Sequence, residues 1–136
     1  MATPPQRDDR TEPSPDAGQP RLSVQQEHGV KVLRFPRGRI DGNGVREMYE
    51  QAIGLMDRPN VRLLIDLAGV EMISSGTMGM LVTINKKSLG VGAQMHVAVP
   101  GDLQMGAFRT MNLDRVLKLF ADASDALRHF KPSAIS

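Results

Sequence analysis

The sequence predicts an α/β fold, with a mixed β-sheet of four to five strands packed with about four α-helices. Three observations lead to this class. A β-hairpin pattern opens the ordered region, and after it strand-like and helix-like segments alternate, as they do in sheets with parallel members. The run Val61-Leu67 is apolar except for one late acid, Asp66, which is typical of a strand covered on both faces.

The first twenty residues differ in composition from the rest of the chain. They hold five of the nine prolines and almost no large apolar side chain. Such a segment cannot bury enough apolar surface to offset the entropy of ordering it, so we expect a disordered Pro-rich tail over residues 1–20. Of the 136 residues, 21–132 are then enough for one domain, and 133–136 are expected to form a short C-terminal tail.

The first elements after the tail read as a hairpin and a helix. Residues 22–25 alternate between apolar and polar side chains, His28-Gly29 offers a two-residue turn, and residues 30–35 resume the strand. Pro36 and Gly38 interrupt the second strand, and the loop 41–44 (Asp-Gly-Asn-Gly) tolerates positive φ. Apolar residues at i, i+3 and i+4 then predict a helix from about residue 45 to 57.

The strand 61–67 is followed by a short loop and a second helix. Met78, Leu81, Val82 and Leu89 recur at helical spacing and are expected to form its inner stripe, and Gly90 and Gly92 end it. At its start lie Ser74, Ser75, Gly76 and Thr77. Hydroxyl side chains at this position cap free backbone N–H groups, and a helix N-terminus favours an anion.

The last third of the domain continues the alternation. Residues 94–99 predict a strand closed by Pro100-Gly101, and 116–120 predict another short strand. A third helix is expected between them on an apolar pattern, and a terminal helix over 123–130. The apolar residues of the third helix are Leu103, Met105, Ala107, Phe108 and Met111.

Composition excludes several classes of function. The formal net charge is +2 with no block of Lys or Arg, so neither nucleic-acid binding nor membrane insertion is indicated. The absence of cysteine excludes disulfides, thiolate chemistry and Cys-ligated metals. The N-terminus has no apolar core of a signal peptide, and no run is long enough to span a bilayer. We therefore expect a cytoplasmic protein.

Catalysis and cofactor binding are also not expected. Ser75 has Ile73 and Thr77 where a hydrolase elbow needs glycines, and there is no phosphate-binding Gly-Lys loop. The histidines His28, His96 and His129 are scattered, so we interpret them as surface or core-edge residues rather than general bases or metal ligands. Aromatic residues are 4% of the chain, too few to favour a flavin. We predict no metal, no cofactor and no catalytic residue, and weak nucleotide binding at the Ser-Ser-Gly-Thr helix start remains as a separate, less favoured alternative.

Residues 21–131 resemble the STAS domain, and most closely the small bacterial anti-sigma factor antagonists. Gly38-Arg39-Ile40-Asp41 is similar to the Gly-x-Leu-Asp corner of that family, and Asp66-Leu67 ends the strand at the usual place. Val70-Glu71-Met72-Ile73-Ser74-Ser75 stands where the family has its Asp-Ser phosphorylation motif. The pattern from Gly92 to Phe120 follows the closing part of the family without a gap.

The resemblance implies a function in the regulation of transcription by partner switching. In its register Ser75 is the phosphorylated serine, and Ser74 stands in place of the usual aspartate. Unphosphorylated protein would bind an anti-sigma factor of the serine-kinase type, phosphorylation would release it, and a phosphatase would be a further partner. The alternative within the family is a non-catalytic subunit of another complex, such as a stress-signalling scaffold or a lipid-transport ATPase assembly.

Six residues are expected at the partner-binding surface: Asp41, Asn43, Ser74, Gly76, Thr77 and Met80. For three of them a purely structural role is the alternative. Ser74 and Asp41 could serve only as helix caps, and Met80 could pack under a neighbouring loop. The sequence leaves open whether the protein is a monomer or a weak dimer.

Overall fold

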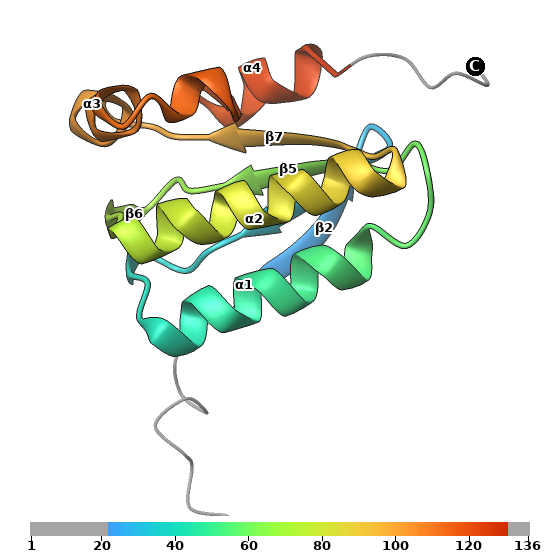
Figure 1. Ribbon diagram of the computed structural model, residues 1–136, viewed down its shortest axis with the longest axis horizontal. Helices are drawn as coiled ribbons and strands as arrows, with labels where there is room; N and C mark the ends of the chain where they lie inside the picture. Colours follow the sequence, from blue (N-terminus) through green and yellow to red (C-terminus); the bar gives the residue numbers. More distant parts are fainter. Residues whose placement is uncertain (1–21, 131–136) are drawn as a thin grey trace, which may run out of the picture.

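A computed structural model describes residues 22–130, so both predicted tails lie outside the described residues (Figure 1). Its main sheet has five strands in the order β2-β3-β5-β7-β8. These are β2 (Ser23–Glu27), β3 (Val30–Arg34), β5 (Arg62–Asp66), β7 (Gln94–Ala98) and β8 (Lys118–Phe120). β2 pairs antiparallel with β3, and the other neighbours are parallel. The predicted α/β class and mixed sheet are confirmed.

The predicted hairpin turn is present between β2 and β3. His28 and Gly29 both have positive φ, 54° and 78°, as a two-residue type I′ turn requires. This turn twists in the same sense as the strands that it joins, so it fixes their register. Glu27 faces Val30, and Ser23 faces Arg34 at the far end.

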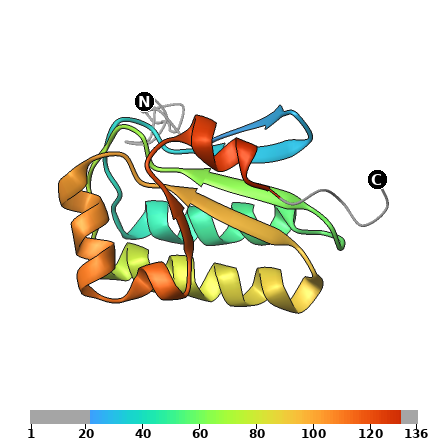
Figure 2. The ribbon, with the colours of Figure 1, turned by 90° about the horizontal axis from the view of Figure 1, so that it is seen from above.

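Helices cover both faces of the sheet (Figure 2). α1 (Gly42–Leu55) and α2 (Ser75–Val91) pack side by side on one face, and α4 (Ala123–Arg128) lies on the other. α3 (Asp102–Thr110) and the 3₁₀ helix η1 (Leu113–Arg115) lie between β7 and β8 in the chain. None of the helices within residues 22–130 is long and apolar enough to cross a membrane.

Alternate residues of the central strands supply two apolar cores. Leu63 and Ile65 of β5 belong to the larger core under α1 and α2, whereas Leu64 belongs to the smaller core under α4. The period of two explains why this strand reads as a continuous apolar run, since both of its faces are buried. A second, two-stranded parallel sheet, β4 (Gly38–Arg39) with β6 (Val70–Met72), was not predicted, because each strand is too short to show a pattern.

The predicted inner stripe of α2 is wrong at one position. Leu89 is exposed instead of lying on the inner stripe of α2, where Asn85 and Ser88 are buried in its place. Asn85 Nδ2 donates to the carbonyl of Val116 at 3.1 Å, and Ser88 Oγ donates to the carbonyl of Asn85 at 2.7 Å. These bonds let polar side chains take core positions. Among the apolar residues that predicted the third helix, Leu103 in α3 is 85% exposed and Met111 at its C-cap is also exposed, whereas Met105 and Phe108 are buried.

Candidate functional site

The N-termini of α1 and α2 lie at the same end of the molecule (Figure 1). Both helices follow strands of the parallel part of the sheet, and each is reached through one strand of the small sheet β4–β6. Their N-caps are Asp41 and Ser74, and both residues are exposed. The positive ends of two helix dipoles therefore open on one surface, which suits a negatively charged group.

The turn that leads from β5 to β6 is held by several backbone bonds. Leu67 N–H donates to the carbonyl of Ala98 at 3.0 Å, and Val70 N–H donates to that of Leu67 at 3.0 Å. Gly69 has φ 87°, a conformation that favours glycine, and its carbonyl accepts from Gly38 N–H at 2.9 Å. The path into α2 is thus fixed by the sheet.

Ser74 is the N-cap of α2, as one of the two readings of this residue predicted. Its backbone is extended (φ −81°, ψ 164°), and its Oγ accepts from Thr77 N–H at 3.1 Å. Oγ also lies 3.2 Å from Thr77 Oγ1, and the Ser74 carbonyl accepts from Met78 N–H at 3.0 Å. One hydroxyl therefore satisfies a free N–H group in the first turn of the helix.

Ser75 is the first residue of α2, and its side chain is exposed. Its hydroxyl makes no hydrogen bond to any residue within 22–130. Because Ser74 Oγ already caps the helix, the Ser75 hydroxyl is not needed as the N-cap. It is the chemically accessible hydroxyl of this turn.

The remaining residues expected at the partner surface differ in their exposure. Gly76 and Asn43 are exposed, and Met80 is half-buried and packs against the larger core. Thr77 is an exception, because its side chain has 0% exposure. It faces inward from the first turn of α2 and shares the hydroxyl contact with Ser74, so it cannot contact a partner directly.

Asp41 closes the start of α1 in the same way. Its Oδ1 accepts from Gly44 N–H at 2.8 Å, and its other carboxylate oxygen makes no bond within the described residues. The predicted cap is confirmed. An exposed negative charge nevertheless remains at the end of the molecule that carries Ser75.

Two exposed apolar side chains near this end were not predicted as site residues. Met72 is the last residue of β6 and is 56% exposed, and Leu103 lies in the first turn of α3. α3 is held against β6 because Gln104 Nε2 donates to the carbonyl of Glu71 at 3.1 Å. The sequence used Leu103 only as one of the apolar residues that predict a helix, and the structure shows that its side chain is exposed.

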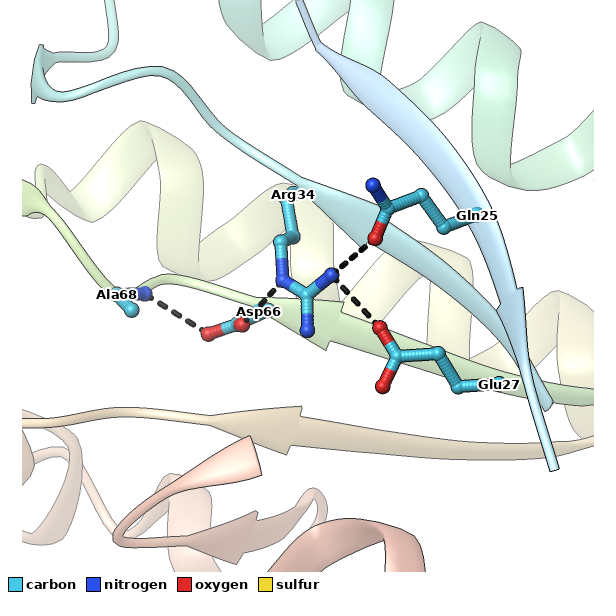
Figure 3. Close-up of polar contacts among 5 residues, drawn as sticks. All are labelled: Gln25, Glu27, Arg34, Asp66 and Ala68. Carbon is cyan, nitrogen blue, oxygen red and sulfur yellow. Dashed lines mark hydrogen bonds and ion pairs between the residues drawn. The ribbon is translucent and has the colours of Figure 1, made fainter. Parts of the chain in front are cut away.

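A polar network lies on the face of the sheet that α4 covers, where β5 ends and the turn to β6 begins (Figure 3). Arg34 Nε donates to Asp66 Oδ2 at 3.0 Å, and its Nη1 donates to Glu27 Oε2 at 2.8 Å and to Gln25 Oε1. Asp66 is 4% exposed, and its other oxygen accepts from Ala68 N–H at 3.0 Å. The hydrogen bond to Glu27 raises the pKa of Arg34 against the opposing effect of burial. The network joins the hairpin to the start of the turn.

The prediction that His96 is a surface or core-edge residue is wrong. Its side chain is buried beneath α4 and is only 2% exposed. Its Nδ1 donates to the carbonyl of Ala126 at 2.9 Å, and its ring stacks on Phe130 with centroids 3.7 Å apart. Burial lowers the pKa of His96, and the nearby charges of Lys118 and His129 lower it further. Within residues 22–130 no three His, Asp or Glu side chains are grouped as metal ligands.

Comparison with known proteins identifies related folds. The sequence matches the STAS domain family over residues 21–126. The crystal structure of an anti-sigma factor antagonist from Mycobacterium paratuberculosis superposes with TM-score 0.67 at 25% identity, covering 79% of this chain and 90% of that one. A STAS domain protein from Planctomyces limnophilus gives TM-score 0.66 at 23% identity, covering 79% and 95%.

The Bacillus cell fate determinant SpoIIAA, solved in its phosphorylated form, gives TM-score 0.60 at 12% identity, covering 81% and 99%. No match was found among curated protein sequences.

Proposed function

The chain belongs to the STAS domain family, and from that premise we propose that it is an anti-sigma factor antagonist. In this proposal the unmodified protein binds an anti-sigma factor of the serine-kinase type in the cytoplasm. The kinase transfers the γ-phosphoryl group of ATP to Ser75 Oγ, the hydroxyl proton and ADP leave, and the complex dissociates. Dephosphorylation by a phosphatase restores binding.

The observation that carries this proposal is the division of roles between Ser74 and Ser75. Ser74 Oγ caps α2, whereas the Ser75 hydroxyl is exposed and makes no hydrogen bond within the described residues. The family has an aspartate where Ser74 stands, and aspartate and serine are equally good N-caps. The change to Ser74 therefore preserves the cap that presents Ser75.

A phosphate on Ser75 would alter an interface rather than the fold. It adds about −1.5 to −2 charge. At a helix N-terminus a negative charge stabilises by about 0.3–1 kcal/mol, so the domain remains folded. A partner that packs over the turn meets added bulk and charge, and the exposed carboxylate of Asp41 at the same end of the molecule adds repulsion toward an acidic partner.

The surface around Ser75 suits a protein partner. The exposed side chains of Met72 and Leu103 offer apolar contact beside the polar turn, and Asn43, Gly76 and the half-buried Met80 complete the proposed surface. Methionine adapts its shape to a partner surface, and apolar contacts with a polar rim are typical of interfaces between proteins.

The proposal is tested with the cognate kinase, identified as the protein that the full chain captures. Incubation with ATP should add one phosphate to the wild type and none to Ser75→Ala. Ser75→Asp should lose binding to the kinase, whereas Thr83→Asp, a matched charge on an exposed hydroxyl residue of the same helix, should bind like the wild type. If Ser75→Asp binds as tightly as wild type, the switch is not at Ser75.

The second candidate is a non-catalytic STAS subunit of a larger complex, such as a stress-signalling scaffold or a lipid-transport ATPase assembly. The observation that favours it is Ser74, because the carboxylate usually found beside the acceptor serine is replaced by a hydroxyl. Constitutive co-purification with such an assembly, with no phosphate on Ser75, would support this candidate over the antagonist.

A further inference from the structure

β2 forms an open edge of the main sheet. Within residues 22–130 its only strand neighbour is β3, and four of its five residues are exposed, with Glu27 half-buried. In the order of the described strands β2 comes last, at the end of the sheet away from β7 and β8. An open edge is a row of free backbone donors and acceptors.

The turn geometry tells which backbone groups of β2 point outward. A two-residue turn makes its flanking residues, Glu27 and Val30, a hydrogen-bonded pair, and such pairs alternate along an antiparallel ladder. Ser23, Gln25 and Glu27 therefore bond to β3. The N–H and C=O groups of Val24 and Gln26 point away from the sheet.

Three features that usually prevent pairing at an edge strand are absent from β2, and its one charged residue, Glu27, is paired with Arg34. Residues 23–27 contain no proline, no lysine and no bulge in their register with β3. The strand is also ordered in advance, because Arg34 binds both Gln25 and Glu27 and is itself held by Asp66 (Figure 3). The other edge strand, β8, has three residues and begins with Lys118, so it is a poorer template.

We propose that β2 pairs antiparallel with β2 of a second copy of this chain, which joins two five-stranded sheets into one continuous sheet. With the two-fold axis at Gln25, Val24 of each copy faces Gln26 of the other. The outward N–H and C=O groups of both residues then form hydrogen bonds with the other copy. Ser23 of one copy faces Glu27 of the other, so no like charges oppose one another. This self-complementarity favours a second copy over an unrelated strand.

The proposal is independent of the function proposed above. α2, which begins at Ser75, contacts β7 and α1, whereas β2 lies at the far end of the strand order, so the edge and the Ser75 turn lie on different parts of the domain (Figure 1). A pair of copies would leave both Ser75 turns accessible. Because the paired segment is short, we expect a weak, concentration-dependent dimer.

The test uses the full chain in sedimentation velocity over a concentration series. Wild type should shift from the mass of one chain to that of two. Val24→Pro should stay monomeric with an unchanged circular dichroism spectrum, because it removes an outward N–H and none of the bonds to β3. Val24→Thr, which keeps the N–H and the β-branch, should dimerise like the wild type.

Measurements on wild type keep the proposal testable if Val24→Pro fails to fold. In a mixture of isotope-labelled and unlabelled chains, the two Gln25 Hα atoms should show an intermolecular nuclear Overhauser effect, because they form a non-hydrogen-bonded pair. A wild type that stays monomeric at its solubility limit would overturn the proposal. A dimer without this contact would also overturn the proposal. Slow hydrogen exchange of the outward amides of Val24 and Gln26 in the monomer would overturn it too, because another segment would then cover the edge.

Discussion

Replacing Arg34 with methionine should destabilise the domain by about 2–3 kcal/mol. The substitution keeps much of the apolar stem but removes the guanidinium that bonds Asp66 at 3.0 Å. Asp66 is 4% exposed, and it would keep only the bond from Ala68 N–H. An uncompensated buried charge costs about 3–5 kcal/mol. The cost here is smaller because the Arg34 side chain is 33% exposed, so water can replace it in part.

Glu27→Gln is the matched control, because it breaks the outer half of the same network. Both side chains of that ion pair are about one-third exposed (33% and 32%), and such pairs contribute about 0–1 kcal/mol. Urea unfolding followed by circular dichroism measures both variants. With a slope of about 1–2 kcal/mol per molar, a loss of about 2–3 kcal/mol in Arg34→Met should lower the midpoint by about 1–3 M.

A double-mutant cycle completes the test. Adding Asp66→Asn to Arg34→Met should recover about half of the lost stability. The second substitution removes the unpaired buried carboxylate of Asp66 and keeps an amide oxygen that can accept from Ala68 N–H. If Arg34→Met costs no more than Glu27→Gln, or if Asp66→Asn brings no recovery, then Asp66 is solvated and the network does not anchor the hairpin.

Three further predictions concern caps and titration. Ser74→Ala should cost about 1 kcal/mol in urea unfolding, whereas Ser75→Ala should stay within about 0.5 kcal/mol, because only Ser74 caps α2. The pKa of His96 is lowered in the folded protein, so as pH falls the unfolded chain takes up a proton before the folded protein does. The contribution of His96 to the free energy of unfolding should therefore be complete above the ordinary imidazole pKa of 6.5 and should be lost as pH falls through the lowered pKa. His96→Gln should flatten that dependence and His28→Asn should not, as shown by urea midpoints across pH. Gly92→Ala should lower stability by about 1–2 kcal/mol in thermal unfolding, because φ is 78° there.

Local patterns in the sequence predicted the features that depend on neighbouring residues. The turn at His28-Gly29 could be identified because two residues tolerant of positive φ separate two alternating segments. The caps Asp41 and Ser74 follow from short polar side chains placed just before an apolar helical repeat. These features need no knowledge of the rest of the chain.

Features that depend on distant residues could not be predicted in the same way. Asp66 stood out as one acid in an apolar strand, but its partner Arg34 lies 32 residues away, and no local pattern joins them. Asn85 can be buried because its Nδ2 donates to the carbonyl of Val116, 31 residues away, whereas Leu89 is exposed. His96 is covered by α4, a helix that follows it by about thirty residues. Tertiary contacts override helical periodicity and polarity at these positions.

The two adjacent serines are subject to different selective pressures. Any mutation that removes the cap at Ser74 carries a cost in folding, so aspartate, asparagine and threonine are the replacements that folding would accept there. Folding imposes no such restriction on Ser75, whose hydroxyl makes no hydrogen bond within the described residues. Under the proposed function, phosphorylation and partner binding restrict the replacement of Ser75. Retention of serine at that position among close relatives would be a direct record of function, separate from any record of stability.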